Sequence, residues 1–292
     1  MTHFIQTLIS GLSLGSIYAL IALGYTMVYG IAKMLNFAHG DIIMIGAYAG
    51  IVTVNQLGLP PIVAVIVSVV ICAGLGMLIE FLAYKPLRQA PPLSVLITAI
   101  GVSYLLQNLA LIIFGSQQKA YPSLIELSSF TIGGVTVDGI SVLTLLMTAL
   151  IMVVLSFFIN KTKLGKAMRA VSEDKNAASL MGISVNRTIT LTFAIGSVLA
   201  AFASIFYGMS YVYIKRTTGA MPGIKAFTAA VFGGIGSIPG AFLGGLLLGI
   251  IEAMAQAYIS TNLANSIVFA VLIVVLLVKP AGLLGKSVTE KV

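Results

Sequence analysis

The segment from Lys161 to Arg187, KTKLGKAMRAVSEDKNAASLMGISVNR, decides the fold because it separates two long stretches without a charged residue. The segment itself holds eight charged residues, six of them basic. Residues 139–160 and 188–214 lack Asp, Glu, Lys and Arg, and each exceeds the roughly 20 residues that a helix needs to cross a bilayer. The segment therefore connects two membrane spans. Because basic loops beside spans stay in the cytoplasm, we expect residues 161–187 to be cytoplasmic.

The composition extends this interpretation to the whole chain. Of 292 residues, 59% are hydrophobic and 8% are charged, whereas soluble domains are about 25% charged. The net charge of +8 comes mainly from bases beside apolar runs, which marks topology rather than a nucleic-acid surface. One cysteine, Cys72, and two histidines allow neither an intrachain disulfide nor a metal cluster. We expect an all-α, polytopic membrane helix bundle that forms one domain over residues 1–292.

Charges, prolines and polar clusters divide the apolar sequence into eight candidate spans. The basic loops between them, together with the carboxyl-terminal tail, are expected in the cytoplasm, which places the amino terminus outside. The expected spans are 4–31, 36–54, 62–82, 93–114, 140–159, 189–212, 240–258 and 263–278. The expected cytoplasmic bases outside residues 161–187 are Lys33, Lys85, Arg88, Lys279, Lys286 and Lys291.

Residues 213–225 do not fit this topology. Counting the spans places them outside, but they hold Lys215, Arg216 and Lys225, which favour the cytoplasmic side. Parity requires that residues 226–239 cross as well, which gives eight to nine spans. Fourteen residues are too short for a straight spanning helix, so a broken or re-entrant segment is expected. Glycines would permit such a break and a half-helix end directed at a pathway. The glycines concerned are Gly233, Gly234, Gly236 and Gly240.

Within the basic segment, a short amphipathic helix is expected to start at Ser172 and end at Gly182. Acidic residues follow Ser172, where the helix dipole favours negative charge, and a glycine is the usual terminator. Two interpretations stay open: the helix lies on the lipid surface, or it docks in a groove of a soluble partner. Its characteristic residues are Glu173, Asp174, Ala177, Ala178 and Gly182.

The motif NFAHGD, Asn36 to Asp41, places three polar side chains where the first apolar run meets the second. Ionisable residues at membrane depth suggest function, so Asn36, His39 and Asp41 are candidates for a translocation path or gate. The alternative is an interfacial turn in which Asp41 pairs with Lys33 and Asn36 caps the second helix.

Two further carboxylates lie within or at the end of apolar runs. Glu80 precedes a basic turn and is expected to pair with Lys85 or Arg88. Glu252 has 26 uncharged residues on each side and must face protein or water rather than lipid. It is either a buried structural carboxylate or a residue of the pathway.

No enzymatic constellation is evident. The string GGIGSIPG lacks the preceding soluble strand of a dinucleotide site, and no GxxxxGK[ST] motif is present. Any ATP hydrolysis must therefore come from another chain. An ion-coupled secondary transporter for small hydrophobic solutes is the alternative, with Asp41 and Glu252 as ion sites.

Two resemblances favour a permease driven by separate ATPases. The sequence DKNAASLMG, Asp174 to Gly182, is similar to the EAA loop of ABC importer permeases, with Asn176 in place of its leading glutamate. The stretches LSLGSIYALIALGYTMVYGIAKMLNFAHGDIIMIGAY, Leu12 to Tyr48, and FTAAVFGGIGSIPGAFLGG, Phe227 to Gly245, resemble the permeases of branched-chain amino acid ABC importers, the LivH type.

The resemblance implies a complex in the bacterial inner membrane. It would contain a second homologous permease, two cytoplasmic ATP-binding subunits and a periplasmic amino-acid-binding protein. This chain would bind no cofactor, ATP would be used by the partner subunits, and the segment 161–187 would be the coupling loop. The transported solutes would be leucine, isoleucine and valine.

Overall fold

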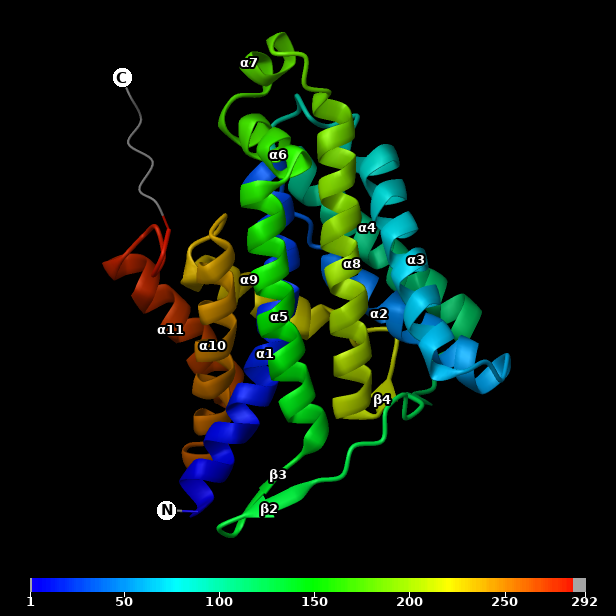
Figure 1. The fold of residues 1–292 in the computed structure, drawn as a ribbon, viewed down its shortest axis with the longest axis vertical. Coiled ribbons are helices and arrows are strands. Elements are labelled where there is room, and N and C mark those ends of the chain that lie inside the picture. The colour runs from blue at the N-terminus through cyan, green and yellow to red at the C-terminus, as the bar shows by residue number, and fades with distance from the viewer. Residues whose placement is uncertain (1, 286–292) are drawn as a thin grey trace.

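The computed structural model describes residues 2–285, which form a helix bundle (Figure 1). Lys286 and Lys291, two of the expected cytoplasmic bases, lie outside the described residues. The helices are α1 (Thr2–Ala32), α2 (His39–Ile51), α3 (Pro61–Ile79), α4 (Pro92–Phe114), α5 (Gly139–Lys161), α6 (Lys163–Glu173), α7 (Lys175–Leu180), α8 (Val185–Tyr211), α9 (Ala220–Gly233), α10 (Ile238–Tyr258) and α11 (Ala264–Val278). Two π-helical turns, η1 (Val52–Gln56) and η2 (Glu80–Tyr84), extend α2 and α3.

Six helices in the described part of the chain are long and apolar enough to cross a membrane: α1, α3 with η2, α4, α5, α8 and α10. In the apolar windows of α1 and α8, 67% of the residues are buried, and in α10 56% are. The corresponding values for α3, α4 and α5 are 28% or less. Helices α1, α8 and α10 therefore form the centre, and the others present apolar side chains outward, as a lipid environment requires.

The central contact between α1 and α10 is made by glycines on both helices. Gly11 and Gly15 of α1 are four residues apart, as are Gly245 and Gly249 of α10. A Cβ atom at Gly11 would lie 2.8 Å from the Cα of Ile250, and one at Gly249 would overlap the backbone of Gly15. The two backbones touch because neither helix has a side chain in between, as the glycine spacing predicts.

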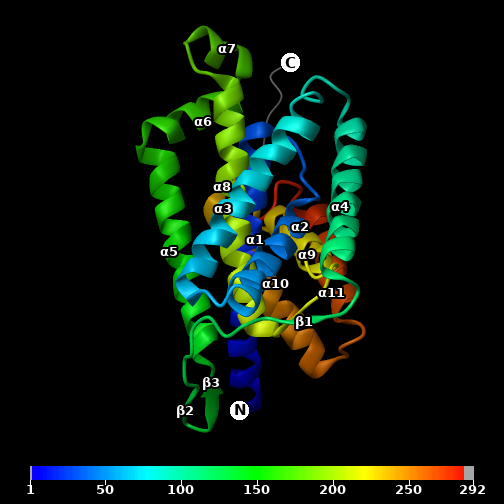
Figure 2. The ribbon, with the colours of Figure 1, turned by 90° about the vertical axis from the view of Figure 1, so that its right-hand side faces the viewer.

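Two shorter helices, α2 and α9, begin inside the bundle rather than at its ends (Figures 1 and 2). Each is preceded by non-helical chain that starts at a non-glycine residue with positive φ: Lys33 before α2 and Val212 before α9, both at 59°. This backbone conformation is uncommon for side chains other than glycine, asparagine or aspartate. Both residues follow a long central helix, so the chain turns back sharply into the bundle at each point.

The two ends of the bundle are distinct. Helix α7 lies at one end, and the start of α1 lies at the other with the hairpin of β2 (Phe130–Ile132) and β3 (Val135–Val137) (Figure 1). Strand β1 (Lys119–Ala120) pairs antiparallel with β4 (Tyr213–Ile214). The sequence predicted an all-α bundle, so these short strands are additional.

One expectation about residues 213–239 was wrong. Lys225 is not a loop residue: it is buried in α9, which begins at Ala220, six residues before the expected crossing. The Lys225 charge, which conflicted with an external position for this region, thus has a partner inside the bundle.

Candidate functional site

Glu252, on α10, is buried and fully engaged inside the subunit. Its carboxylate accepts hydrogen bonds from Lys225 Nζ at 2.6 Å, Tyr18 Oη at 2.9 Å and Gln256 Nε2 at 3.1 Å. The side chains of Lys225 and Glu252 are 9% and 4% exposed. The prediction that Glu252 faces protein is confirmed. The ion pair joins α9 to α10, and Tyr18 adds α1, so three helices meet at one neutralised carboxylate.

The amino-terminal ends of α2 and α9 meet in the middle of the bundle. Gly40 of α2 lies against Gly219 and Gly223, and a Cβ at Gly223 would be 3.0 Å from the Cα of Gly40. Because both helix dipoles point their positive ends at this place, a negative charge there is favoured. Asp41 supplies it from the first turn of α2.

Asn36, His39 and Asp41 of the NFAHGD motif are all buried, but not as the interfacial turn would require. Asp41 Oδ1 accepts from Gln107 Nε2 of α4 at 3.0 Å rather than pairing with Lys33. Asn36 accepts from Tyr84 Oη at 3.0 Å, and no side chain caps α2. That alternative was wrong, because the chain descends into the bundle before α2 starts. His39 packs edge-on against Tyr25, with ring centroids 4.8 Å apart.

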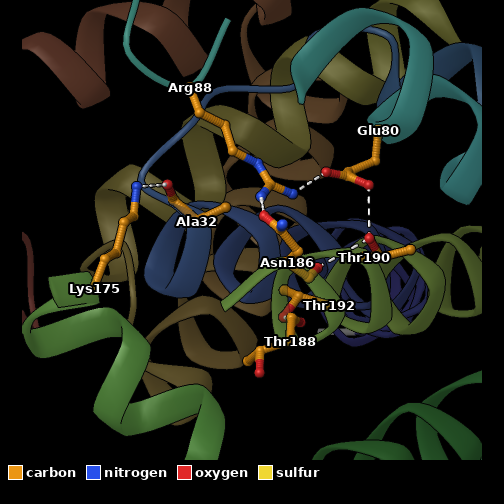
Figure 3. Close-up of polar contacts among 8 residues, drawn as sticks. All are labelled: Ala32, Glu80, Arg88, Lys175, Asn186, Thr188, Thr190 and Thr192. Carbon is orange, nitrogen blue, oxygen red and sulfur yellow. Dashed lines mark hydrogen bonds and ion pairs between the residues drawn. The ribbon is translucent and has the colours of Figure 1, made fainter. Parts of the chain in front are cut away.

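A polar network at the α7 end of the bundle ties the α3–α4 connection to the start of α8 (Figure 3). Arg88 forms an ion pair with Glu80 and donates to Asn186. Glu80 also accepts from Thr190 Oγ1 at 2.7 Å. The predicted pairing of Glu80 with Arg88 is confirmed. The side chain of Glu80 is 1% exposed, so the pair is a buried structural contact.

The short helix in the basic segment is α7, and it starts two residues later than expected. Asp174, not Ser172, is its cap: Oδ1 accepts from the backbone N–H of Asn176 at 2.7 Å and of Ala177 at 3.0 Å. Ser172 lies within α6, of which Glu173 is the last residue. Gly182 has φ 79° and follows the helix end, as a glycine terminator does. The predicted helix is thus present with a corrected start.

The surface of α7 is apolar at its tip. Leu180 and Met181 are 89% and 81% exposed, while Ala178 is buried against the rest of the loop. On the inner side, Lys175 Nζ donates to the carbonyl of Ala32 at 3.3 Å, at the last residue of α1 (Figure 3). Burial, and then the charges of Arg88 and Lys33, lower the pKa of Lys175 below the ordinary 10.5. Helix α7 therefore contacts the connection that leads into α2.

The four glycines expected in a broken segment lie around the connection between α9 and α10. Gly233 is the last residue of α9, Gly234 and Gly236 have φ 107° and 92°, and Gly240 lies in the first turn of α10. This connection packs near Gly30, close to the end of α1. The half-helix end inside the bundle is instead the start of α9.

Known proteins resemble this chain over almost its whole length. Residues 7–277 match the family described as "Branched-chain amino acid transport system / permease component". The chain belongs to the branched-chain amino acid permease family. It is 44% identical to the "High-affinity branched-chain amino acid transport system permease protein BraD" of Pseudomonas aeruginosa, covering 99% of this chain and 98% of that protein. It is 45% identical, with the same coverage, to the permease protein LivH of Escherichia coli K12.

A more distant relative also matches most of the chain. The probable branched-chain amino acid transport permease protein LivH of Methanocaldococcus jannaschii is 28% identical over 92% of this chain and 89% of that protein. The matched family is one of transport components, and the six long apolar helices make this permease a multi-pass membrane protein.

Several residues of the permease site were missed at the sequence level. Lys225 was assigned to a loop because it follows Lys215 and Arg216, although the 14 residues of α9 hold it one turn inside a helix. Gln107 and Tyr18 gave no signal, since a single polar residue in an apolar run is common. Lys175 was counted only as a topology charge.

Proposed function

We propose that this chain is one of two permease subunits of an ATP-driven importer for branched-chain amino acids in the bacterial inner membrane. The observation that carries the proposal is α7, a capped helix with an exposed apolar tip, set on a loop that contacts the transmembrane bundle at two points. Such a helix fits a groove of a soluble partner better than a lipid surface, because α7 lies at the far end of the molecule (Figure 1) and the apolar side chains of Leu180 and Met181 are exposed there. The partners would be two cytoplasmic ATP-binding subunits, a second homologous permease and a periplasmic amino-acid-binding protein.

The proposal includes nine crossings, with the amino terminus outside. Three segments add to the six long helices: the stretch that ends in α2 and η1, the stretch that ends in α9, and α11. Helix α9 covers only about 21 Å at 1.5 Å per residue, less than the roughly 30 Å of hydrocarbon, so the non-helical residues 213–219 complete its crossing. An odd number of crossings would put the two ends of the chain on opposite sides of the membrane.

The mechanism follows from the contacts of the coupling loop. Closure of the ATPases on ATP moves their grooves and α7 with them. Lys175 transmits this movement to the end of α1, and Asn186 and Thr190 transmit it to the α3–α4 connection. Residues 33–38 then carry it to the place where α2 and α9 meet. The bundle thereby shifts between outward-open and inward-open arrangements. ATP is used by the partner subunits, and this chain binds no cofactor.

Reconstituted transport tests this function. The chain, its partner subunits and the binding protein are placed in proteoliposomes loaded with ATP, and uptake of labelled leucine is measured. Uptake is expected to require ATP and to survive an uncoupler that collapses the proton gradient. Loss of uptake with the uncoupler alone would replace the proposal by an ion-coupled secondary transporter.

Variants of α7 test the coupling role in the same vesicles. Asp174→Lys removes the cap and Gly182→Val forces a β-branched residue to φ 79°, so both should lower leucine uptake about tenfold, a loss of about 1.4 kcal/mol in coupling, while ATP hydrolysis persists. Glu173→Lys, which reverses the neighbouring charge, is expected to act in the same direction. Glu126→Lys, an exposed residue at the opposite end, is the matched control. Wild-type uptake in all three variants would remove α7 from the mechanism.

A further inference from the structure

A cavity of about 400 Å³ lies between the last turn of α8, strand β4 and the first turn of α9, on the side of the bundle away from α7. None of the residues proposed so far for the pathway or for coupling lines it. Its volume is within the range of small-molecule sites. Its lining includes Tyr207, Tyr211, Tyr213, Lys215, Thr217 and Met221.

The aromatic wall is built by a sharp turn of the chain. Tyr207 and Tyr211 are four residues apart on α8, and their rings stack with centroids 4.4 Å apart. Val212 then adopts φ 59°, which is strained for a β-branched residue. The turn lets Tyr213, on β4, line the same cavity as Tyr211. Strain of this kind needs compensation from the surrounding structure, and here the turn places three tyrosines beside one hollow, with Tyr211 and Tyr213 45% and 61% exposed.

The charge of the lining has one sign. Lys215 contributes an ammonium group, and no carboxylate is among the described residues that line the cavity. Helix α9 also begins here, at Ala220, so its positive dipole end adds to the lysine. The backbone N–H of Lys215 donates to Thr218 Oγ1 at 2.7 Å, which fixes the turn that carries the lysine. Such a place attracts an anionic group of a ligand.

The rest of the lining suits the other parts of an α-amino acid. Tyrosine faces attract a cation such as a primary ammonium group. Met221 and Pro222 offer apolar surface for an aliphatic side chain. The next ionisable groups along α9 and α10, Lys225 and Glu252, are already paired with each other and do not compete for the charges of a zwitterion.

We propose that this cavity is the first binding station for a zwitterionic amino acid with an aliphatic side chain. Lys215 and the start of α9 hold the carboxylate, the stacked tyrosines face the ammonium group, and Met221 contacts the side chain. The inference rests on the proposed function and specifies where this subunit meets its substrate. The cavity lies on the side of the bundle where the proposed topology places the periplasm.

Protection of a cysteine tests the site directly. Met221→Cys is introduced into a chain with Cys72→Ala, and the assembled complex without its binding protein is treated with a polar maleimide. At leucine concentrations ten times its Kd, modification should slow about tenfold by mass action. Leucinamide, which lacks the carboxylate, should protect little. Equal protection by leucine and leucinamide would overturn the proposed polarity of binding, and absence of protection at both Met221→Cys and Tyr213→Cys would overturn the site.

A matched pair of variants tests the contribution of Lys215 to ligand binding. Lys215→Gln should raise the leucine concentration needed for half protection about tenfold, as loss of one charged partner does. Arg216→Gln changes the adjacent cation, which does not line the cavity, and should leave protection unchanged. Equal effects of the two substitutions would exclude a specific carboxylate contact.

The failure of this site and of the proposed function are distinguishable. Leucine uptake in the complete system without protection of residue 221 would refute the cavity alone. Protection by leucine in a complex that does not take up leucine would refute the importer function and leave the site.

Discussion

Glu252 and Lys225 form a buried ion pair, and neither charge would be stable without the other inside an apolar bundle. Removing one partner of a buried pair leaves the other charge unpaired, which typically costs about 3–5 kcal/mol, whereas removing both is far milder. The carboxylate also serves Tyr18 and Gln256, so its hydrogen-bonding capacity matters beyond its charge. The pair thus links the stability of α9 to that of α1 and α10.

We expect Glu252→Leu to lower the unfolding temperature in detergent most, since it strands the Lys225 ammonium group. Glu252→Gln should be tolerated better, because the amide still accepts from Tyr18. The double substitution Glu252→Leu with Lys225→Met should be more stable than Glu252→Leu alone. Glu126→Gln, at an exposed carboxylate, is the control. A Glu252→Leu protein that melts like the wild type would contradict a structural pair.

The pKa of Lys175 offers a test of the contacts that this side chain makes in the coupling loop. Its pKa is lowered by burial first and by Arg88 and Lys33 next, so the ammonium form is disfavoured in the folded protein. Between the lowered pKa and 10.5 the unfolded chain binds more protons. Burial of Lys175 therefore opposes folding at lower pH, and this cost is relieved as the pH rises through that window.

The pH dependence of acylation, followed by mass spectrometry of the Lys175 peptide, measures this pKa. The midpoint is expected below 10.5 and should move back towards it in Lys33→Gln, which removes one of the two cations. A midpoint at or above 10.5 in the wild-type complex would show that the side chain is solvated and does not hold the carbonyl of Ala32.

At the scale of helices, the α1–α10 contact depends on positions where no side chain fits. A Cβ at Gly249 would overlap the backbone of Gly15, so Gly249→Ala must push the helices apart. Overpacking of this kind costs about 1–3 kcal/mol. The expected result is a lower unfolding temperature in detergent. Gly74→Ala on α3, where nothing lies within 4 Å of the added Cβ, is the matched control. Equal stability of the two variants would mean that the helices do not pack this closely.

The helices differ in how far the sequence could predict them. The long spans follow from uncharged length alone, and the pairing of Glu80 with Arg88 follows from their closeness in sequence. The starts of α2 and α9 do not, because they are fixed by a contact between Gly40 and Gly219, which lie far apart in the chain. For the same reason Lys225 could not be assigned to Glu252: the 26 residues between them contain the turn from α9 to α10, and only the folded geometry shows which side of α9 faces α10.

At the scale of the whole molecule, the arrangement of its ends predicts an orientation. In a chain with Cys72→Ala, single cysteines at positions 175 and 126 should be labelled from opposite sides of the membrane. Position 126 should react with an impermeant maleimide in intact cells, and position 175 only after the membrane is opened, because basic loops stay in the cytoplasm. Reaction of position 175 from outside would invert the topology.

The meeting of α2 and α9 has a consequence for how a pathway could open. Where Gly40 faces Gly219, bare backbone touches bare backbone. Parting the two half-helices there would separate backbone from backbone at the glycines and Phe37 from Phe227, whose ring centroids are 5.4 Å apart. Both positions would then tolerate no residue but glycine, and a change at one could not be repaired by a change at the other.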